Sequence, residues 1–334
     1  MSRKQITLAD IAAACGTSNV TVSKALSGKS GMSDELREKI IATANEMGYV
    51  PSKAASAAMG GTIGIIVPEK FTNPNGSFYL ALYNHLMQGF KRENYSCIQE
   101  ILTLSEEEAL EMPAFLRTNT VMGVISLGQL SPKYLTKLIE VGKPLLLLDY
   151  YVRDIDIDCI ITNGYFGMYK LTCHLISQGH KQIGFVGTPK ATSSIADRYM
   201  GYLKALMEFG LPIEENWVVE DRRPNNDLYE ELVYPVDMPT AFVCNCDEAA
   251  FKVIKQLKEL GYSVPEDISV VGYDNYNISE ICDPPITTIN VDAREMAELA
   301  VATVVERINN PKAPTRMQIL DGKPVYKASV KKLC

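Results

Sequence analysis

Four side chains near the start of the chain have the chemistry needed to read duplex DNA. Asn19, Val20, Ser23 and Lys24 fall on the outward face of a short predicted helix. Asn can hydrogen-bond adenine, Lys can reach guanine or a phosphate, Ser can bond a phosphate, and Val can contact the methyl group of thymine. The residue types and their spacing therefore indicate a surface that fits the major groove.

Two short helices joined by a tight turn would hold these side chains in place. The first helix is predicted from an apolar face at helical spacing, which consists of Leu8, Ile11, Ala12 and Cys15. Thr7 can cap its start, and Asp10 lies in the first turn, where the helix dipole favours a carboxylate. Gly16 suits the left-handed position that ends a helix.

The second helix follows the turn, and a third helix completes the group. Ser18 can cap the second helix, whose inner face consists of Val22, Ala25 and Leu26. The third helix is predicted between its cap, Ser33, and its terminator, Gly48. This layout is typical of a helix-turn-helix, in which the second helix enters the major groove. It also fits a small helical bundle that binds no nucleic acid.

The N-terminal part of the chain and the remainder differ only slightly in net charge. Residues 1–60 carry seven Lys and Arg against five Asp and Glu, a net charge of +2, and the remaining residues carry 26 against 35, a net charge of −9. A DNA-binding head on a non-binding body would show this sign of asymmetry, although a larger one is common.

A short Ala-rich segment, 51–61, follows the third helix. Pro51 can start a helix, and Gly60 and Gly61 must stop it. A helix of fewer than ten residues is marginal in water because nucleation is costly. The segment can therefore be coil when free and helix when a partner holds it, or it can be a plain flexible linker.

The chain resembles a known family in three motifs. These are Thr-Leu-x-Asp-Ile-Ala from Thr7, Val-Thr-Val-Ser-Lys-Ala-Leu-Ser-Gly from Val20, and Gly-Tyr-Val-Pro-Ser from Gly48. They closely resemble the LacI/GalR family of bacterial transcription regulators, and the resemblance covers nearly all 334 residues. It implies an all-α helix-turn-helix headpiece over 1–50, a hinge helix over 51–61 that folds on DNA, and a core that senses a small molecule.

The resemblance also implies a homodimer that binds a pseudo-palindromic double-stranded DNA operator, most often as a repressor. Asn19, Val20 and Lys24 would contact bases, while Thr21 and Ser23 would contact the DNA backbone. The two hinge helices of the dimer would enter the minor groove, where an apolar side chain kinks the duplex. The residues expected to contact DNA are Thr7, Ser18, Asn19, Val20, Thr21, Ser23, Lys24, Ala58 and Met59.

Three positions depart from the family's pattern. Lys24 stands where the family usually has Arg, and because Lys is a point charge, base discrimination there would be weaker. Ala58 stands where the wedging Leu is usual, so either Met59 replaces it or the operator is bent less. Ser56 stands where Arg is common, which removes a phosphate or base contact. We expect DNA binding in either case.

The remainder of the chain alternates apolar runs with helical patterns. Strands are predicted over 62–67, 121–126, 144–149, 182–187, 240–244 and 268–273, with a last strand over 325–330. Helices between them are predicted over 78–92, 164–179, 195–209 and 247–260. Continuous apolar strands suit parallel sheets buried on both faces, so this order predicts doubly wound α/β folding.

The core, 62–334, is long enough for two lobes. The resemblance implies a core like that of periplasmic binding proteins. Its first lobe covers about 62–161 and 292–320, and its second lobe about 162–291 and 321–334. Three chain crossings would form a hinge, with the ligand in the cleft between the lobes. In open α/β sheets, ligands bind beyond the carboxyl ends of the strands.

Two charged residues are candidates for that cleft. Asp274 follows a predicted strand, and Arg198 lies in a predicted helix in an Arg-x-x-Gly pattern. Both side chains make charge-assisted hydrogen bonds, which suits a sugar or a similarly polar effector. A structural ion pair is the alternative from the residues alone, whereas the resemblance implies contact with effector.

Three further cleft candidates are Phe78, Tyr79 and Cys246. Phe78 and Tyr79, at the start of a helix, could stack on a ligand or belong to the core. Cys246 matches the family's effector-binding Asn, and a thiol is a weak hydrogen-bond partner. The ligand would therefore carry fewer hydroxyl groups than a typical sugar, or the site has diverged.

Composition and motifs exclude several other classes. No apolar run is long enough to span a membrane, and the first residues show no signal-peptide core. The eight cysteines show no disulfide pattern, which predicts a cytoplasmic protein. The chain has only three His and no dinucleotide or nucleophile motif, so we expect no metal, no cofactor and no enzyme activity. The alternative function is a small-molecule carrier of the periplasmic-binding class that does not bind DNA.

Overall fold

The structure of the chain is a computed structural model. It describes residues 6–26, 32–47, 49, 61–72, 78–223 and 228–333. Contacts divide the chain into two compact units. The smaller unit comprises Met1–Thr62 and Lys91–Ser96, and the larger unit comprises Ile63–Phe90 and Cys97–Cys334.

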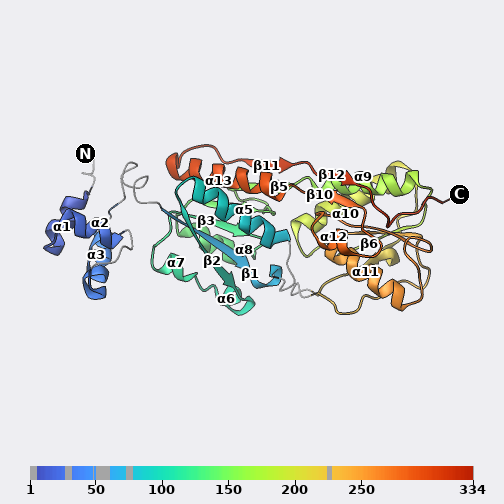
Figure 1. The fold of residues 1–334 in the computed structure, drawn as a ribbon, viewed down its shortest axis with the longest axis horizontal. Helices are drawn as coiled ribbons and strands as arrows, with labels where there is room; N and C mark the ends of the chain where they lie inside the picture. The colour runs from blue at the N-terminus through green and yellow to red at the C-terminus, as the bar shows by residue number, and fades with distance from the viewer. Residues whose placement is uncertain are drawn as a thin grey trace. The chain divides into compact units, whose positions relative to one another are not determined.

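Three helices lie in the described N-terminal part of the smaller unit (Figure 1). They are α1 (Leu8–Cys15), α2 (Asn19–Leu26) and α3 (Asp34–Glu46). Their buried faces meet in one apolar core made of Ile11, Ala12, Cys15, Val22, Ala25, Ile40 and Ala44. The three helices and their apolar faces agree with the periodicity of the sequence.

The helix caps form where the sequence predicts them. Thr7 Oγ1 accepts a hydrogen bond from Asp10 N at 3.3 Å, and Asp10 Oδ2 accepts one from Thr7 N at 2.8 Å. Gly16 has φ +67°, which a side chain would strain. Ser18 Oγ accepts from Thr21 N at 3.1 Å. These bonds satisfy N–H groups that a helix leaves unpaired at its start. Gly48, the expected terminator of α3, lies outside the described residues.

The larger unit begins with a six-stranded sheet in the order β11-β5-β4-β3-β1-β2. Its strands are β1 (Thr62–Pro68), β2 (Ser96–Leu102), β3 (Gly123–Leu127), β4 (Leu145–Leu148), β5 (Asp158–Thr162) and β11 (Met317–Leu320). The pairs β1–β3, β3–β4, β4–β5 and β5–β11 are parallel. We call this sheet and the helices on it lobe 1.

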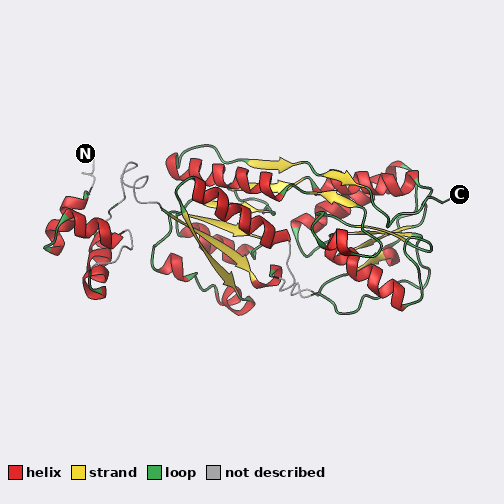
Figure 2. Ribbon diagram, viewed as in Figure 1, coloured by secondary structure: helices red, strands yellow, loops and turns green. Residues whose placement is uncertain are grey.

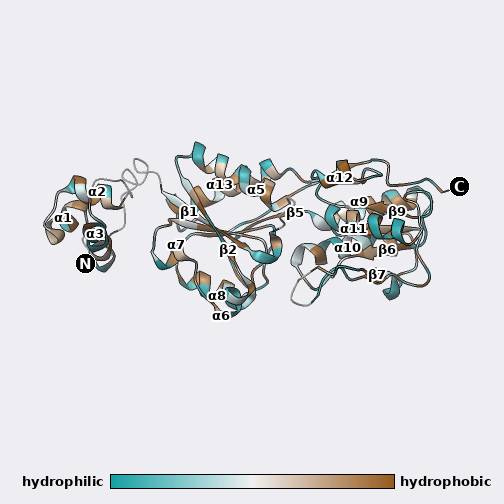
Figure 3. Cartoon of the chain, turned by 60° about the horizontal axis from the view of Figure 1, so that its bottom comes forward, coloured by the Kyte–Doolittle hydropathy of each residue, from teal (hydrophilic) through white to brown (hydrophobic). Residues whose placement is uncertain are grey.

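Helices cover both faces of the sheet in lobe 1. They are α5 (Phe78–Arg92), α6 (Leu104–Ala109), α7 (Ala114–Arg117), α8 (Pro132–Glu140) and α13 (Ala293–Asn309), and a 3-10 turn, η1 (Glu69–Phe71), follows β1. Helices α5 and α13 lie on one face, and α6 to α8 on the other (Figures 1 and 3). Apolar side chains of α7 and α8 pack on β3 and β4. The strands are therefore buried from both sides, which explains their continuous apolar sequences.

A four-stranded parallel sheet in the order β7-β6-β8-β9 forms the centre of lobe 2 (Figure 2). Its strands are β6 (Ile183–Val186), β7 (Val218–Val219), β8 (Ala241–Cys244) and β9 (Ser269–Val271). Its helices are α9 (Gly164–Ser177), α10 (Ser193–Glu208), α11 (Asp247–Glu259) and α12 (Ile278–Ile281), with a 3-10 turn, η2 (Glu215–Trp217).

A short antiparallel pair accompanies these two sheets. It joins β10 (Thr288–Asn290) to β12 (Lys323–Val325). Because β10 also lies beside the end of β9 and β11 belongs to the sheet of lobe 1, the chain passes between the lobes three times. The passages follow β5, β10 and β11.

Each of the six predicted parallel strands overlaps an observed strand, but other expectations differ from the structure. The sequence did not indicate β2 or β5, because polar residues such as Gln99, Glu100 and Asp158 interrupt their apolar patterns. The strand predicted over 325–330 is wrong, since β12 ends at Val325. Beyond it, Ser329 Oγ accepts from Thr287 N at 2.9 Å and donates to Val270 O at 2.5 Å, so loop contacts hold that segment.

Candidate functional site

The outer face of α2 presents the side chains that could enter a groove. Val20 is 64% exposed, although it is apolar. Asn19 and Lys24 are also exposed, while Thr21 and Ser23 are half-buried. Each of these residues lies on the helix between positions whose side chains form the core. The packing of α2 on α1 and α3 therefore leaves a small face whose donors, acceptors and methyl groups remain accessible.

The other residues expected to contact DNA have different positions. Thr7 and Ser18 are exposed at the starts of α1 and α2, but their hydroxyl groups already serve the helix caps. They could approach a phosphate only together with the backbone N–H groups of those helix ends. Ala58 and Met59 lie outside the described residues.

A second group of polar side chains surrounds Arg198, which extends from α10. Its guanidinium Nη1 donates to Asn245 O at 2.7 Å, and Nη2 donates to Asp274 Oδ1 at 3.4 Å. The guanidinium also lies 4.0 Å from the centre of the Tyr273 ring. Arg198 is only 5% exposed, and its Nε has no hydrogen-bond partner among the described residues. A buried donor without a partner is costly, so a ligand acceptor at this position would stabilise the site.

Asp274 lies just beyond the carboxyl end of β9. It has a positive φ of +107°, and its backbone N–H donates to Ile289 O at 2.9 Å, next to β10. Burial raises the pKa of Asp274 well above its ordinary value, although the nearby Arg198 lowers it. The strand order thus places a carboxyl group at the edge where α/β proteins bind ligands.

Two residues of lobe 1 complete this group. Tyr79, at the start of α5, donates its hydroxyl to Asp149 Oδ2 at 2.8 Å. Asp149 follows β4 with φ +68° and is 6% exposed. Burial raises its pKa, while Arg198 of lobe 2 lowers it. Asp149 of lobe 1 thus lies within the electrostatic surroundings of Arg198 of lobe 2.

Phe78 and Cys246 have structural roles in the neighbourhood of this site. Phe78 is buried, with its ring edge against Tyr79 at a centroid distance of 5.9 Å. Cys246 caps α11, because its Sγ accepts a hydrogen bond from Ala249 N at 3.4 Å. Cys246 nevertheless interacts electrostatically with Arg198 and Asp274, so its side chain belongs to the surroundings of the same site.

Two protein-family models match the chain, one over the helices that include α2 and one over most of lobe 2 and the C-terminal part of the chain. The model described as bacterial regulatory proteins, lacI family, matches residues 7–52, and that of the periplasmic binding protein-like domain matches residues 172–330. The chain is also 30% identical over 311 residues to the NTD biosynthesis operon regulator NtdR of Bacillus subtilis, covering 91% of this chain and 93% of that protein. The chain belongs to the LacI family of bacterial regulatory proteins.

Two other similarities support this LacI-family assignment. The HTH-type transcriptional repressor PurR of Mannheimia succiniciproducens is 29% identical over 336 residues, which cover 98% of this chain and 99% of that protein. The crystal structure of the lac repressor dimer bound to operator and the anti-inducer ONPF superposes with a TM-score of 0.68 at 22% identity, covering 98% of this chain and all of that chain. The fold expected from the sequence, a helix-turn-helix with a two-lobed core, is therefore confirmed.

The sequence patterns missed one ion pair near the polar site of this LacI-family protein. Arg222 donates to Asp221 through Nε at 3.0 Å and Nη2 at 2.7 Å. Asp221 also accepts from Thr188 N at 2.9 Å and from Asn245 Nδ2 at 2.8 Å. Both charged residues follow β7, whose two residues are too few to give a recognisable strand pattern. The sequence therefore contained no recognisable strand end that could have indicated this ion pair.

Hydrogen bonds between the lobes run beside the polar site. Gln129 Oε1 of lobe 1 accepts from Ser193 N at 2.8 Å, and Tyr151 donates its hydroxyl to Asp197 Oδ1 at 2.9 Å. Ser193 and Asp197 belong to α10, the helix that carries Arg198. The position of Arg198 relative to lobe 1 is therefore set by direct bonds as well as by charge.

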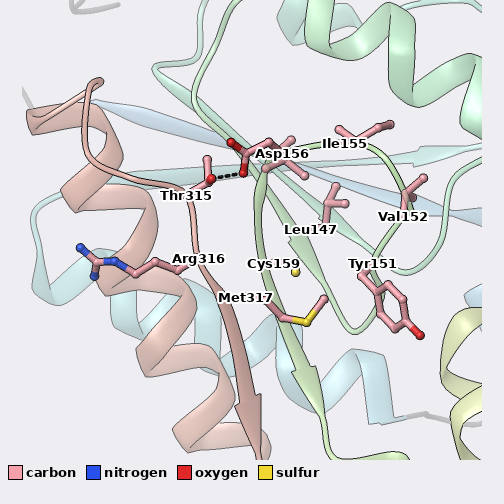
Figure 4. Close-up of a pocket in the computed structure, with 10 residues that line it drawn as sticks. Leu147, Tyr151, Val152, Ile155, Asp156, Cys159, Thr315, Arg316 and Met317 are labelled. Atoms are coloured by element: carbon pink, nitrogen blue, oxygen red, sulfur yellow. Dashed lines mark hydrogen bonds between the residues drawn. The ribbon is translucent and has the colours of Figure 1, made fainter.

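A small pocket lies elsewhere, on lobe 1 between β4, β5 and β11 (Figure 4). Tyr151, Cys159 and Met317 line it, Thr315 donates a hydrogen bond to Asp156 at its rim, and the Arg316 side chain points away. Its volume of about 160 Å³ is well below the ~300–1,000 Å³ of typical ligand sites. This pocket is therefore too small to be a typical effector site.

Among residues 6–26, 32–47, 61–72, 78–223 and 228–333, no helix is long and apolar enough to cross a membrane.

Proposed function

We propose that this LacI-family protein is a cytoplasmic repressor that binds a pseudo-palindromic DNA operator as a homodimer and responds to a small molecule. The exposed outer face of α2, within a segment that matches the family model over residues 7–52, carries the proposal. The lac repressor structure, which has the same fold, was solved as a dimer bound to operator. A carrier that does not bind DNA would have no use for such a face.

The proposed DNA contacts divide by chemistry. Asn19, Val20 and Lys24 contact base edges, since their side chains are exposed on α2. Thr21 and Ser23 contact the DNA backbone from the sides of the same helix. Thr7 and Ser18 support phosphate contacts at the helix ends. In the hinge, Ala58 and Met59 would face the minor groove.

The division of the chain follows the same proposal. Residues 1–50 form the headpiece, 51–61 the hinge, and 62–334 the core. In the core, the first lobe covers about 62–161 and 292–320, and the second covers about 162–291 and 321–334. Strands β5 and β11 belong to the same sheet, which supports the assignment of both to the first lobe.

The proposed effector site is the buried group of Tyr79, Asp149, Arg198 and Asp274, with Phe78 and Cys246 in its surroundings. Its effector is sugar-like, because a LacI family transcriptional regulator from Enterococcus faecium with a similar fold was solved with bound ribose. Because the side chains come from both lobes, an effector between them would stabilise one relative position of the lobes. The effector would change operator affinity to the extent that it binds the two states differently.

A selection of operator sequences tests this proposal. The full-length protein is incubated with a pool of random duplexes at moderate ionic strength, and bound duplexes are amplified and sequenced. We expect a pseudo-palindromic motif. The control is the Asn19→Ala, Lys24→Ala double variant, which should lose the motif and keep its fold. No enrichment over input by the unsubstituted protein would contradict the proposal.

A further inference from the structure

The proposed effector site contains more carboxyl groups than cationic groups. Asp149 of lobe 1 and Asp274 of lobe 2 are 6% and 8% exposed. Arg198 interacts electrostatically with both carboxyl groups, and each carboxyl group raises the pKa of Arg198. Two buried carboxylates therefore share one guanidinium. An uncompensated buried carboxylate is costly, so the site favours a further positive charge or a bound proton.

Each of these side chains also has an unused hydrogen-bonding atom. Among the described residues, Asp149 accepts only the hydroxyl of Tyr79, at Oδ2, and Asp274 accepts only Arg198 Nη2, at Oδ1. Arg198 Nε, which is buried, has no partner. The site therefore offers one buried N–H that needs an acceptor and two carboxyl groups that can accept further hydrogen bonds.

The other charged groups around the site do not supply the missing cation. Arg222 is held by Asp221 through two bonds of 3.0 and 2.7 Å. Asp247 accepts a hydrogen bond from Thr288 Oγ1 at 2.6 Å and is a further carboxyl group near Asp274, as is Glu248. Together these groups increase the excess of carboxylates.

We propose that the effector carries a protonated amine, which lies between Asp149 and Asp274, and a neighbouring hydroxyl oxygen that accepts from Arg198 Nε. An ammonium group has three N–H donors and can serve carboxylates on opposite sides. The hydroxyl groups of a neutral sugar could donate to the same oxygens but would leave the negative charge in place. The ligand class is thus an amino sugar or another polyhydroxylated amine.

This inference rests on the proposed function, which provides the effector site, and it adds a reason for coupling. Asp149 and Asp274 repel each other, and they belong to different lobes. A cation between them turns this repulsion into two attractions. The amine would therefore favour the arrangement in which the two lobes approach each other.

Matched sugars test the inference on the full-length protein. Glucosamine, galactosamine and mannosamine are each compared with the parent sugar and with the N-acetyl derivative, which keeps the nitrogen but not its charge. Thermal shift and calorimetry are the readouts. We expect at least one amino sugar to bind tenfold or more tightly than both of its neutral counterparts. Equal or tighter binding of the neutral forms, or no binding of any amino sugar, would overturn the inference.

A pair of variants distinguishes an effect of the Asp149 charge on effector binding from an effect on the fold. Asp149→Asn keeps the shape of the side chain and should reduce the preference for the amine to less than threefold. Asp154→Asn is the matched control, because Asp154 is an exposed aspartate of lobe 1 whose positive φ of +64° Asn tolerates. A preference that persists in Asp149→Asn overturns the inference.

The same experiments distinguish this inference from the proposed function. Suppose that neutral sugars bind the protein and cause it to release the selected operator, whereas amino sugars do neither. The proposed effector site would then be supported, and the inference that the effector carries an amine would be wrong. Failure of the operator selection, which requires no sugar, would instead count against the proposed function.

Discussion

Arg198 and Asp274 form a buried ion pair in which Nη2 lies 3.4 Å from Oδ1. The distance is long for a charge-assisted hydrogen bond, which is usually ~2.7–2.9 Å. A closer bond to Asn245 O, at 2.7 Å, and the ring of Tyr273 hold the guanidinium from other directions. Asp274 is therefore free to exchange part of its interaction with Arg198 for a ligand.

We expect Asp274→Asn to abolish the thermal shift caused by effector while operator binding without effector stays within twofold. Asn keeps the size of the side chain and tolerates the positive φ, but it lacks the charge. The control is Asp237→Asn, on an exposed aspartate of lobe 2. A normal effector response in Asp274→Asn would show that the effector binds elsewhere.

Lys24→Ala should weaken operator binding by about 1–3 kcal/mol, because loss of a base contact typically costs that much. Gel shifts at a fixed salt concentration measure the affinity. Lys255→Ala provides the same change of charge at an exposed position of α11 in the core. Equal affinities of the two variants would remove Lys24 from the interface. A decrease that is the same for every duplex sequence would assign Lys24 to a phosphate rather than to a base.

Cys246→Ser should stabilise the protein by about 0.5–1 kcal/mol, because Ser is a far better helix cap than a thiol. The hydroxyl would accept the bond from Ala249 N, which now ends on Sγ at 3.4 Å, and the change in size is small. Urea denaturation of the core measures the difference. Cys246→Ala, which cannot cap, should be less stable than both. A Ser variant no more stable than the Ala variant would contradict the assigned cap.

Asp247 should make the stability of the core depend on pH. It is fully buried, and burial raises its pKa to about 7, against 3.8 for an exposed carboxyl group, with Thr288 opposing the shift. The folded state therefore binds a proton that the unfolded state releases between these values. Stability from this group is present below pH 3.8 and is lost as pH rises through about 7.

Asp247→Asn should remove this loss, because the amide stays neutral. We expect the free energy of unfolding of the variant, minus that of the unsubstituted protein, to increase by about 1 kcal/mol per pH unit between pH 5 and pH 6.5. Urea denaturation at several pH values measures it. The exposed Asp237→Asn variant should show no such trend. A constant difference across this range would mean that Asp247 is ionised throughout.

Local patterns in the sequence were sufficient for the headpiece. The faces of α1, α2 and α3, the caps at Thr7 and Ser18, and the left-handed Gly16 depend on residues within about four positions of one another. Hydrogen bonds of one helical turn connect the same positions, so the spacing of residue types predicts the structure directly. Family motifs in that segment then indicated DNA binding. The parallel strands of the core were predicted for a similar reason, since both of their faces are buried.

Only the tertiary structure decided which polar side chains meet in the core. Asp149 was predicted as the end of a strand, and nothing in its neighbourhood indicated a partner for Tyr79 or Arg198. Those contacts depend on the order of strands in two sheets and on three passages of the chain between lobes, which bring distant segments together. Strands β5 and β7 were missed because one is interrupted by a buried aspartate and the other is too short. The spacing of apolar residues predicts which face of each segment is buried. Which charged side chains meet in one site depends instead on how the segments pack against one another.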